Sequence, residues 1–401
     1  MYIDDPMRFR KAALAGALEH MCQSLELTAT QLDEAKTHYD AVAEWLAAAA
    51  DPALRSLSIY LQGSTALGTT VKPLGGNEHD VDLVAHMARV EHRGPAEIKR
   101  VIGDRLKEHA RYGAMLVEKQ RCWRLPYANR FHLDITPSVL NPACRQGGEL
   151  VPDKRLRCWK ESNPKGYKAL FGRRAAIVPT MRLAKSAFDS TTARADVEPY
   201  PDTPRFKGLL RRIVQIAKRH RDVHFAERYP ERAPISVLIT TLASQSYERC
   251  ATQMVFDSEL DLLLTVIRHM PDFIERRIEG GHLRWFVWNE TTHGENFAER
   301  WNDDPQLANA FFLWHGKLVS DLETLERVEG LDRLGKSLQD SFGGAPATRA
   351  IDAITQEVSA ARTRNRLYVA PRVGLVAAAG AAAIAGAAPV RGNTFFGAEP
   401  A

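Results

Sequence analysis

Two aspartates separated by one residue constrain this chain more than any other feature of its sequence. Asp80 and Asp82 lie in the run 79–84, which reads His-Asp-Val-Asp-Leu-Val. Successive side chains of a β-strand point to opposite faces of the sheet, so the two carboxylates share one face while the aliphatic residues beside them enter a core. Carboxylates on one face can hold a metal ion, and Mg²⁺ prefers oxygen ligands. The run therefore predicts a strand that carries part of a metal site.

A glycine-serine pair upstream of the acids predicts a phosphate-binding element. The β-rich run 58–62 leads into Gly63 and Ser64, and a turn at 75–77 comes just before the acid pair. A glycine lets backbone N–H groups approach a phosphate closely, and a serine hydroxyl adds a further donor. We therefore expect Gln62, Gly63 and Ser64 to bind a nucleotide.

A third acid is expected on a neighbouring strand. Apolar and polar residues alternate over 131–136, which is the period of a half-buried strand, and Pro137 is expected to end it. Asp134 then lies on the polar face. Nucleotidyl transfer uses two metal ions, which activate the attacking hydroxyl and neutralise the triphosphate. We assign Asp80, Asp82 and Asp134 as catalytic residues and as ligands of two Mg²⁺ ions, for which Mn²⁺ can substitute.

These parts are common when each stands alone, and their combination is what carries information. A lone Asp-x-Asp is more often a solvated strand edge or turn, and a lone Gly-Ser is usually a turn. In this order and spacing they resemble the polymerase-beta-like nucleotidyltransferase superfamily. Within it the chain looks most like the CD-NTases, the bacterial relatives of cyclic GMP–AMP synthase and oligoadenylate synthase. The resemblance covers roughly residues 30–342 and is most specific at the Gly-Ser pair and the three aspartates.

The resemblance implies an α+β fold with a small mixed sheet, flanking helices, a helical second lobe and a flexible C-terminal tail. We expect a catalytic lobe over 1–200, in which a helix at 30–50 spans both lobes, and a helical lobe over 201–342. The remaining residues, 343–401, are rich in Ala and Gly. Few large apolar side chains predict a disordered tail that is dispensable for folding.

Two residues of the second lobe match positions that hold the donor triphosphate in the resembled family. Lys218 lies on an amphipathic helix predicted for 205–221, and Ser236 opens the next helix. An ammonium is a compact phosphate-binding charge, and a helix N-terminus also favours an anion. The alternative is a solvated basic face for Lys218 and a simple helix cap for Ser236.

Composition agrees with an enzyme that acts on small anions. At 401 residues and 45% hydrophobic, the chain is long enough for two lobes, and its net charge of +5 is too mild to indicate obligate nucleic-acid binding. Five cysteines without Cys-x-x-Cys spacing favour a reducing, cytoplasmic location. An uncharged stretch at 373–390 is mostly Ala and Gly, which insert weakly into membranes, so no membrane association is expected.

The resemblance implies synthesis of a cyclic oligonucleotide second messenger from nucleoside triphosphates, with release of pyrophosphate. In CBASS antiphage systems this messenger activates a downstream effector, and a ubiquitin-type ligase can act on the synthase C-terminus, here Ala401. No His-Cys-Cys cluster suggests the zinc element with which the animal enzyme binds DNA, so activation by DNA is doubtful. Base identity, product size, linkage, activating signal and oligomeric state stay open. The alternatives are a nucleotidyltransferase that modifies an RNA end, a small molecule or a protein, and, more weakly, a non-catalytic nucleotide-binding module.

Overall fold

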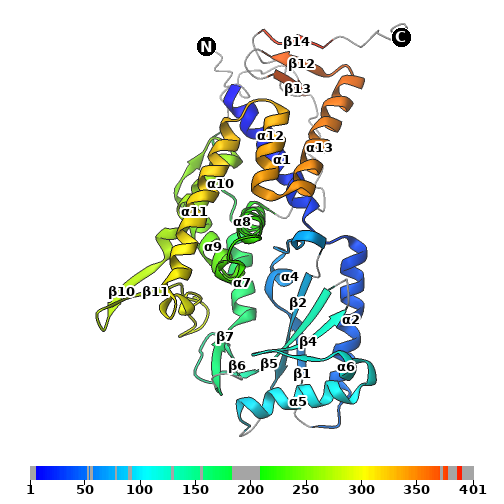
Figure 1. Cartoon of the computed structure of the whole chain (residues 1–401), viewed down its shortest axis with the longest axis vertical. Helices are drawn as coiled ribbons and strands as arrows, with labels where there is room; N and C mark the ends of the chain where they lie inside the picture. The colour runs from blue at the N-terminus through cyan, green and yellow to red at the C-terminus, as the bar shows by residue number, and fades with distance from the viewer. Residues whose placement is uncertain are drawn as a thin grey trace, which may run out of the picture.

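The structure is a computed structural model that describes residues 6–51, 54, 57–76, 79–88, 93–127, 131–153, 157–182, 208–370, 374–377 and 386–390. Its elements form two lobes arranged along the long axis of the molecule (Figure 1). A sheet backed by helices forms one lobe, and a bundle of helices forms the other. The expected α+β fold with a small mixed sheet is confirmed.

One seven-stranded sheet organises the first lobe. Its strand order is β1-β2-β5-β4-β3, with β6 and β7 added beyond the end of β5. The strands are β1 (Leu57–Leu61), β2 (His79–Met87), β3 (Val117–Glu118), β4 (Trp123–Tyr127), β5 (Phe131–Leu140), β6 (Glu149–Asp153) and β7 (Cys158–Ser162). Only β2 and β5 run parallel to one another within this sheet, and the other neighbours are antiparallel.

Helices cover one face of the sheet and leave the other face to the site. Val81, Leu83 and Ala85 of β2 are buried in one cluster with side chains of α2 (Ala29–Ala47) and α5 (Pro95–Glu108). Burial of each large aliphatic side chain contributes roughly 1.5–3 kcal/mol. The alternation along β2 then directs Asp80 and Asp82 to the opposite face, as expected. The short α6 (Ala110–Met115) follows α5.

Pro137 does not end its strand, contrary to the expectation from sequence. β5 continues to Leu140, and Pro137 pairs with Ala85 of β2. On its other side, the β4 ladder ends at Ile135 and the β6 ladder begins at Val139. Pro137 lies in the gap between these two partners, so its missing N–H removes no ladder hydrogen bond there.

The second lobe is a helical bundle around a large aromatic and aliphatic core. Trp314, Phe311, Tyr247 and Phe342 are among its largest buried side chains. Its main helices are α8 (Leu209–Phe225), α9 (Ser236–Gln253), α10 (Glu259–Arg268), α11 (Pro305–Arg327) and α12 (Leu331–Phe342). Smaller elements are β8 (Thr180–Met181), β9 (Val255–Phe256) and the single turns η3 (Pro230–Arg232), η4 (Met270–Phe273) and η5 (Glu299–Asn302). The hairpin of β10 (Glu275–Glu279) and β11 (His282–Phe286) projects from the bundle (Figure 1).

The lobes do not divide the chain at residue 200. The α1 helix (Pro6–Ser24) and the α7 helix (Pro164–Ala175) both belong to the helical bundle, where Met21 and Phe171 are buried. All buried residues of α2 instead pack in the sheet lobe, so the helix expected to span both lobes does not do so. The expectation was wrong because amphipathic spacing shows that a helix has a buried face but does not show which core receives it.

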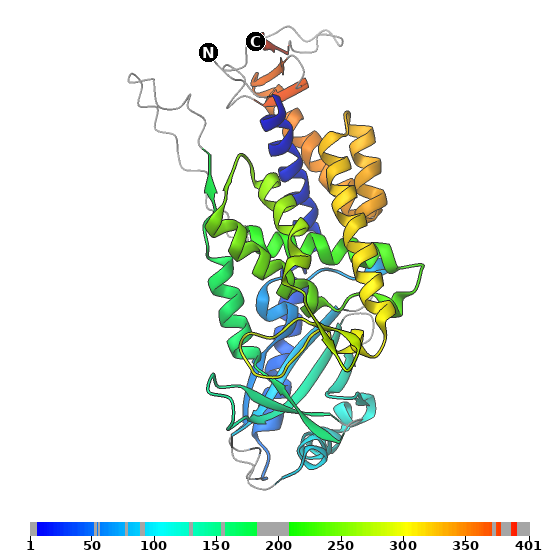
Figure 2. The same ribbon diagram turned by 90° about the vertical axis from the view of Figure 1, so that its left-hand side faces the viewer.

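The segment after Gly343 is also structured over much of its described length. The α13 helix (Gly344–Thr363) packs against α1 and α12, and Ala350 is 0% exposed in the core (Figures 1 and 2). Strands β12 (Leu367–Ala370), β13 (Gly374–Ala377) and β14 (Ala388–Pro389) form a small sheet. The prediction of a tail disordered from 343 is therefore wrong, because alanine favours helix and its small side chain permits close helix packing. Ala401 lies outside the described residues.

None of the helices in the described part of the chain combines the length and hydrophobicity that a bilayer crossing requires.

Substituting Ala350 should test whether α13 belongs to the core. Ala350→Asp places a carboxylate among buried apolar side chains and should lower the free energy of unfolding by about 3 kcal/mol or more, measured by urea denaturation. Gln356→Asp puts the same charge on the exposed side of α13 and should cost less than about 1 kcal/mol. Equal unfolding midpoints for the two variants would show that α13 does not contribute to the core.

Candidate active site

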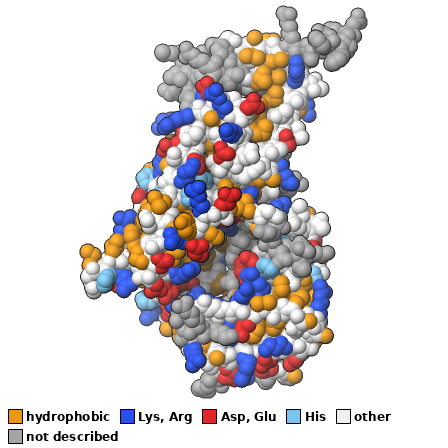
Figure 3. Space-filling view, viewed as in Figure 1, with side chains coloured by type: hydrophobic (Ala, Val, Ile, Leu, Met, Phe, Trp, Pro, Cys, Tyr) orange, Lys and Arg blue, Asp and Glu red, His pale blue; other side chains and the backbone are white. Residues whose placement is uncertain are grey.

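The parallel pairing of β2 with β5 brings the three predicted acids together. In this register Asp82 lies directly opposite Asp134, and Asp80 lies opposite His132. All three carboxylates are on the face of the sheet turned away from α2 and α5. Asp134 is only 9% exposed, whereas Asp80 is exposed. The acids thus run from a buried position to an open one, and a space-filling view shows a hollow between the lobes (Figure 3).

Arg124 is a site residue that the sequence analysis missed. It lies on β4 directly opposite Asp134, and its Nε and Nη2 atoms each donate to the Asp134 carboxylate at 2.6 Å. Its Nη2 is also 3.2 Å from Asp80 Oδ1. A bidentate arginine fixes both the position and the plane of a carboxylate. The alternation in 123–127 places Arg124 on the polar face, but only the strand register shows that it meets Asp134.

The charges of the site are not balanced by protein groups alone. Burial raises the pKa of Asp82 to about 7, and the nearby carboxylates of Asp134 and Asp80 add to this increase. Arg124 and Lys218 act in the opposite direction and compensate only in part. Cations favour the ionised form of a carboxylate, so this acidic set fits a divalent cation in charge and in ligand chemistry. Among the described residues, no group of three or more His, Cys, Asp or Glu side chains has the arrangement of a formed metal site.

Gly63 lies so close to Asp82 that a side chain would displace the carboxylate. Its φ is +63°, and a Cβ built on it would lie 2.3 Å from Asp82 Oδ2. Gly63 begins the short α4 helix (Gly63–Leu67), whose first N–H groups have no intrahelical acceptor. The glycine is therefore required by both its backbone conformation and its neighbour.

Gln62 supports the site without lining the adjoining cavity. Its backbone N–H donates to the Asp82 carbonyl at 2.9 Å, and its side-chain Nε2 donates to Thr136 Oγ1 at 3.3 Å. These bonds join the end of β1 to both β2 and β5. A direct contact with a nucleotide, as expected from sequence, stays a prediction.

A cavity of about 470 Å³ between the lobes collects residues that are far apart in sequence. Ser64 and Asp80 line it from the sheet lobe, and Lys218, Arg221 and Ser236 line it from the helical lobe. We call it the donor cavity. The short turn η1 (Leu74–Gly76) also contributes to its wall through Leu74. The structure thus brings the predicted phosphate-binding residues Ser64, Lys218 and Ser236 around one space.

Lys218 is not part of a solvated basic face. It is 5% exposed, and its Nζ donates to the Thr69 carbonyl at 2.9 Å. Arg211 and Gln215, on the same helix, donate to the carbonyls of residues 67 and 70, each at 2.9 Å. The α8 helix thereby binds the segment that follows Gly63 and Ser64. Burial, with a smaller effect of Arg221, lowers the pKa of Lys218 to about 8.

Ser236 is not a simple helix cap either. Ile235 is the N-cap of α9, and Ser236 is the first helical residue. The Ser236 hydroxyl accepts a hydrogen bond from Arg221 Nη1 at 3.0 Å, and the same nitrogen donates to the Pro234 carbonyl at 2.8 Å. Arg221 was missed in the sequence, although its position three residues after Lys218 on a helix predicts a shared face.

Comparisons with known proteins relate the chain to synthases of nucleotide second messengers. The family description "Second Messenger Oligonucleotide or Dinucleotide Synthetase domain" matches residues 13–174. A protein of Roseivirga ehrenbergii named c-di-GMP synthase is 29% identical over 392 residues, covering 96% of this chain and 98% of the relative. Cyclic dinucleotide synthase CdnG of Bradyrhizobium diazoefficiens is 27% identical over 374 residues, which are 88% of this chain and 86% of the relative.

A solved structure supports the fold independently. The structure of the Bradyrhizobium diazoefficiens CD-NTase CdnG in complex with GTP superposes with a TM-score of 0.64 at 22% identity. The match covers 88% of this chain and 100% of that structure. Fold and site together define a nucleotidyltransferase of the polymerase-beta-like class. The chain matches the second-messenger synthetase domain over residues 13–174 and is similar along most of its length to two named cyclic dinucleotide synthases.

Two glycine substitutions should separate backbone strain from displacement of Asp82. Gly63→Ala should lower synthesis by about a hundredfold, because a shift of about 1 Å in a reacting group has an effect of that size. Gly75 has a φ of +73° but open space around its Cβ position. Gly75→Ala should therefore destabilise the fold by about 1–2 kcal/mol yet keep most activity. Similar losses of activity in both variants would assign the effect to strain alone.

Asp82→Asn should remove activity without lowering stability at alkaline pH. An ordinary aspartate ionises near pH 4 in the unfolded chain, whereas the folded pKa is about 7, so this group costs stability increasingly as pH rises between these values. In a chelator, the variant should melt at or above the temperature of the parent at pH 8. The two melting temperatures should converge towards pH 4. A variant that melts well below its parent at pH 8 would show that ionised Asp82 stabilises the fold.

Proposed function

We propose that this protein joins two molecules of GTP into the cyclic dinucleotide c-di-GMP and releases two molecules of pyrophosphate. The observation that carries the proposal is the donor cavity, which Asp80, Ser64 and Lys218 line, together with the strand pairing that places Asp82 and Asp134 on the same face of the sheet as Asp80. The choice of guanine is supported by the relatives, one named c-di-GMP synthase and one solved with GTP. We also propose that it acts in CBASS antiphage defence, as the family resemblance implies.

No covalent bond to the protein forms in the proposed reaction. In each of two rounds, a ribose hydroxyl oxygen forms a bond to an α-phosphorus while the bond to pyrophosphate breaks, and the second round closes the ring. We assign Asp80, Asp82 and Asp134 as the residues that would hold two Mg²⁺ ions. Bound there, the ions would activate the hydroxyl and neutralise the leaving group.

The remaining residues of the site position the triphosphate and the carboxylates. Lys218, with a pKa of about 8, is mostly protonated at neutral pH, and a neighbouring triphosphate favours that charged form further. Arg221 donates to the Ser236 oxygen at the cavity wall, which leaves the Ser236 hydroxyl hydrogen to be donated to a phosphate oxygen. Arg124 keeps the Asp134 carboxylate in a fixed orientation and neutralises part of the acidic charge.

Product analysis tests the proposal directly. The purified full chain, incubated with radiolabelled GTP and Mg²⁺, should yield a phosphatase-resistant product with the mass of c-di-GMP. The product should disappear in a chelator and in the Asp80→Ala, Asp82→Ala double variant. ATP, CTP and UTP supplied singly should give little cyclic product.

Other products would redirect the assignment. A phosphatase-resistant product containing another base would keep cyclic synthesis but overturn the guanine assignment. If label appeared only on an added RNA, small molecule or protein, the chain would be a transferase of the alternative kind. The attachment of a ubiquitin-like partner through Ala401 stays a proposal that rests on the resemblance alone.

A further inference from the structure

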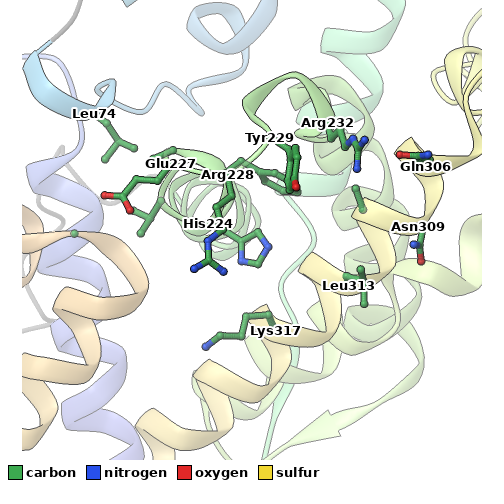
Figure 4. A pocket seen from close by; sticks show the side chains of 15 residues that line it. Leu74, His224, Glu227, Arg228, Tyr229, Arg232, Gln306, Asn309, Leu313 and Lys317 are labelled. Carbon is green, nitrogen blue, oxygen red and sulfur yellow. The ribbon is translucent and has the colours of Figure 1, made fainter.

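A second and larger cavity lies on the helical lobe, beside the donor cavity. Its volume is about 770 Å³, and it forms where the end of α8 and the segment 226–232 face α11 (Figure 4). His224, Arg228, Tyr229 and Arg232 line it from the first side, and Lys317 lines it from α11. We call it the second cavity. None of the acids of β2 and β5 contributes to its wall.

The charges of the second cavity favour an anion. Arg228, Arg232 and Lys317 line it together with a single carboxylate, that of Glu227. Arg228 has no hydrogen-bond or ion-pair partner among the described residues. In the close view its guanidinium lies beside His224, on the side of the cavity nearest Lys317 (Figure 4). Three cations around one space, one of them unpaired, form a site that phosphate oxygens can neutralise.

The second cavity also offers apolar surface suited to a flat ring. Tyr229 is 61% exposed and Leu313 is 67% exposed, and both line it. Tyr229 has φ 53° and ψ 54°, a left-handed conformation that is uncommon for a bulky residue and costs about 1–3 kcal/mol. The Arg232 guanidinium stacks on its ring, with a distance of 4.7 Å to the ring centroid. A strained backbone thus presents an aromatic side chain to solvent beside cationic groups.

We propose that the second cavity is a regulatory nucleotide site, separate from the donor cavity. A nucleobase would pack against Tyr229 and Leu313, and its phosphates would lie near Arg228 and Lys317. The chemistry is that of a nucleoside phosphate, which the triphosphate substrate and the cyclic product share. The experiment below distinguishes these two sources.

The two cavities share part of their walls, so a ligand in the second cavity can affect the active site. Leu74, Phe225 and Ala226 line both cavities. Along the segment 226–236, Arg228 and Arg232 face the second cavity, whereas Pro230 and Ser236 face the donor cavity. A nucleotide that fixes Arg228 and Arg232 therefore also affects the position of Ser236, because only a few backbone residues separate them. We expect it to change the apparent KM for the donor triphosphate.

Binding stoichiometry tests the site without requiring catalysis. The full chain carrying Asp82→Asn would be titrated calorimetrically with GTP in one arm and with c-di-GMP in the other. At least one of the two should bind at an additional site, which Arg228→Ala and Lys317→Ala each weaken about tenfold. Arg327→Ala is the matched control. It removes an exposed cation from α11, the helix that carries Lys317, and Arg327 lines neither cavity. It should leave both affinities unchanged.

Each outcome decides the inference. An additional GTP site identifies the substrate as the ligand, and an additional c-di-GMP site identifies the product. If neither ligand binds beyond the two GTP or the one c-di-GMP that the active site itself accepts, or if Arg228→Ala and Lys317→Ala bind like Arg327→Ala, the second cavity is not a nucleotide site. The kinetic part rests on the proposed function: added regulatory nucleotide should shift the donor KM in the parent but not in Arg228→Ala. Because the titration measures binding alone, its failure is distinguishable from failure of cyclic dinucleotide synthesis.

Discussion

The repulsion among three carboxylates on one face of the sheet is the constraint on which the rest of the site depends. Backbone pairing of β2 with β5 places Asp82 opposite Asp134, and no rotation of either strand can separate them without loss of the apolar core behind. Arg124 neutralises part of this negative charge. The remaining negative charge, together with burial, raises the pKa of Asp82. The unbalanced charge explains why such a site suits divalent cations and the polyphosphates they accompany.

The α8 helix links this acidic sheet lobe to the helical lobe. Four side chains of α8 donate to backbone carbonyls in the segment that follows the Gly-Ser pair, and Lys218 is one of them. These bonds hold the segment after Gly63 and Ser64 against the helical lobe, so the two lobes meet at the donor cavity. The end of the same helix, at His224, reaches the second cavity. Occupancy of either cavity is therefore expected to influence the other through α8 and the segment after it.

The C-terminal helix α13 is part of the helical lobe. The α13 helix packs against α1 and α12, so the first and last described helices of the chain lie side by side in one bundle (Figures 1 and 2). Small alanine side chains suffice for this contact because they bring helix backbones close together. The last described strand, β14, also lies at the end of the molecule distant from the sheet lobe (Figure 1).

Local patterns in the sequence determined the parts of this protein that depend on residues near each other. The shared face of Asp80 and Asp82, the strand around Asp134 and the helix at Lys218 all follow from periodicities of two or 3.6 residues. Only the tertiary structure decided that Arg124 meets Asp134, that Pro137 lies inside a strand, and that α1, α7 and α13 share one core. Those features depend on strand register and on which buried faces meet, and these are contacts between distant residues that no local period encodes.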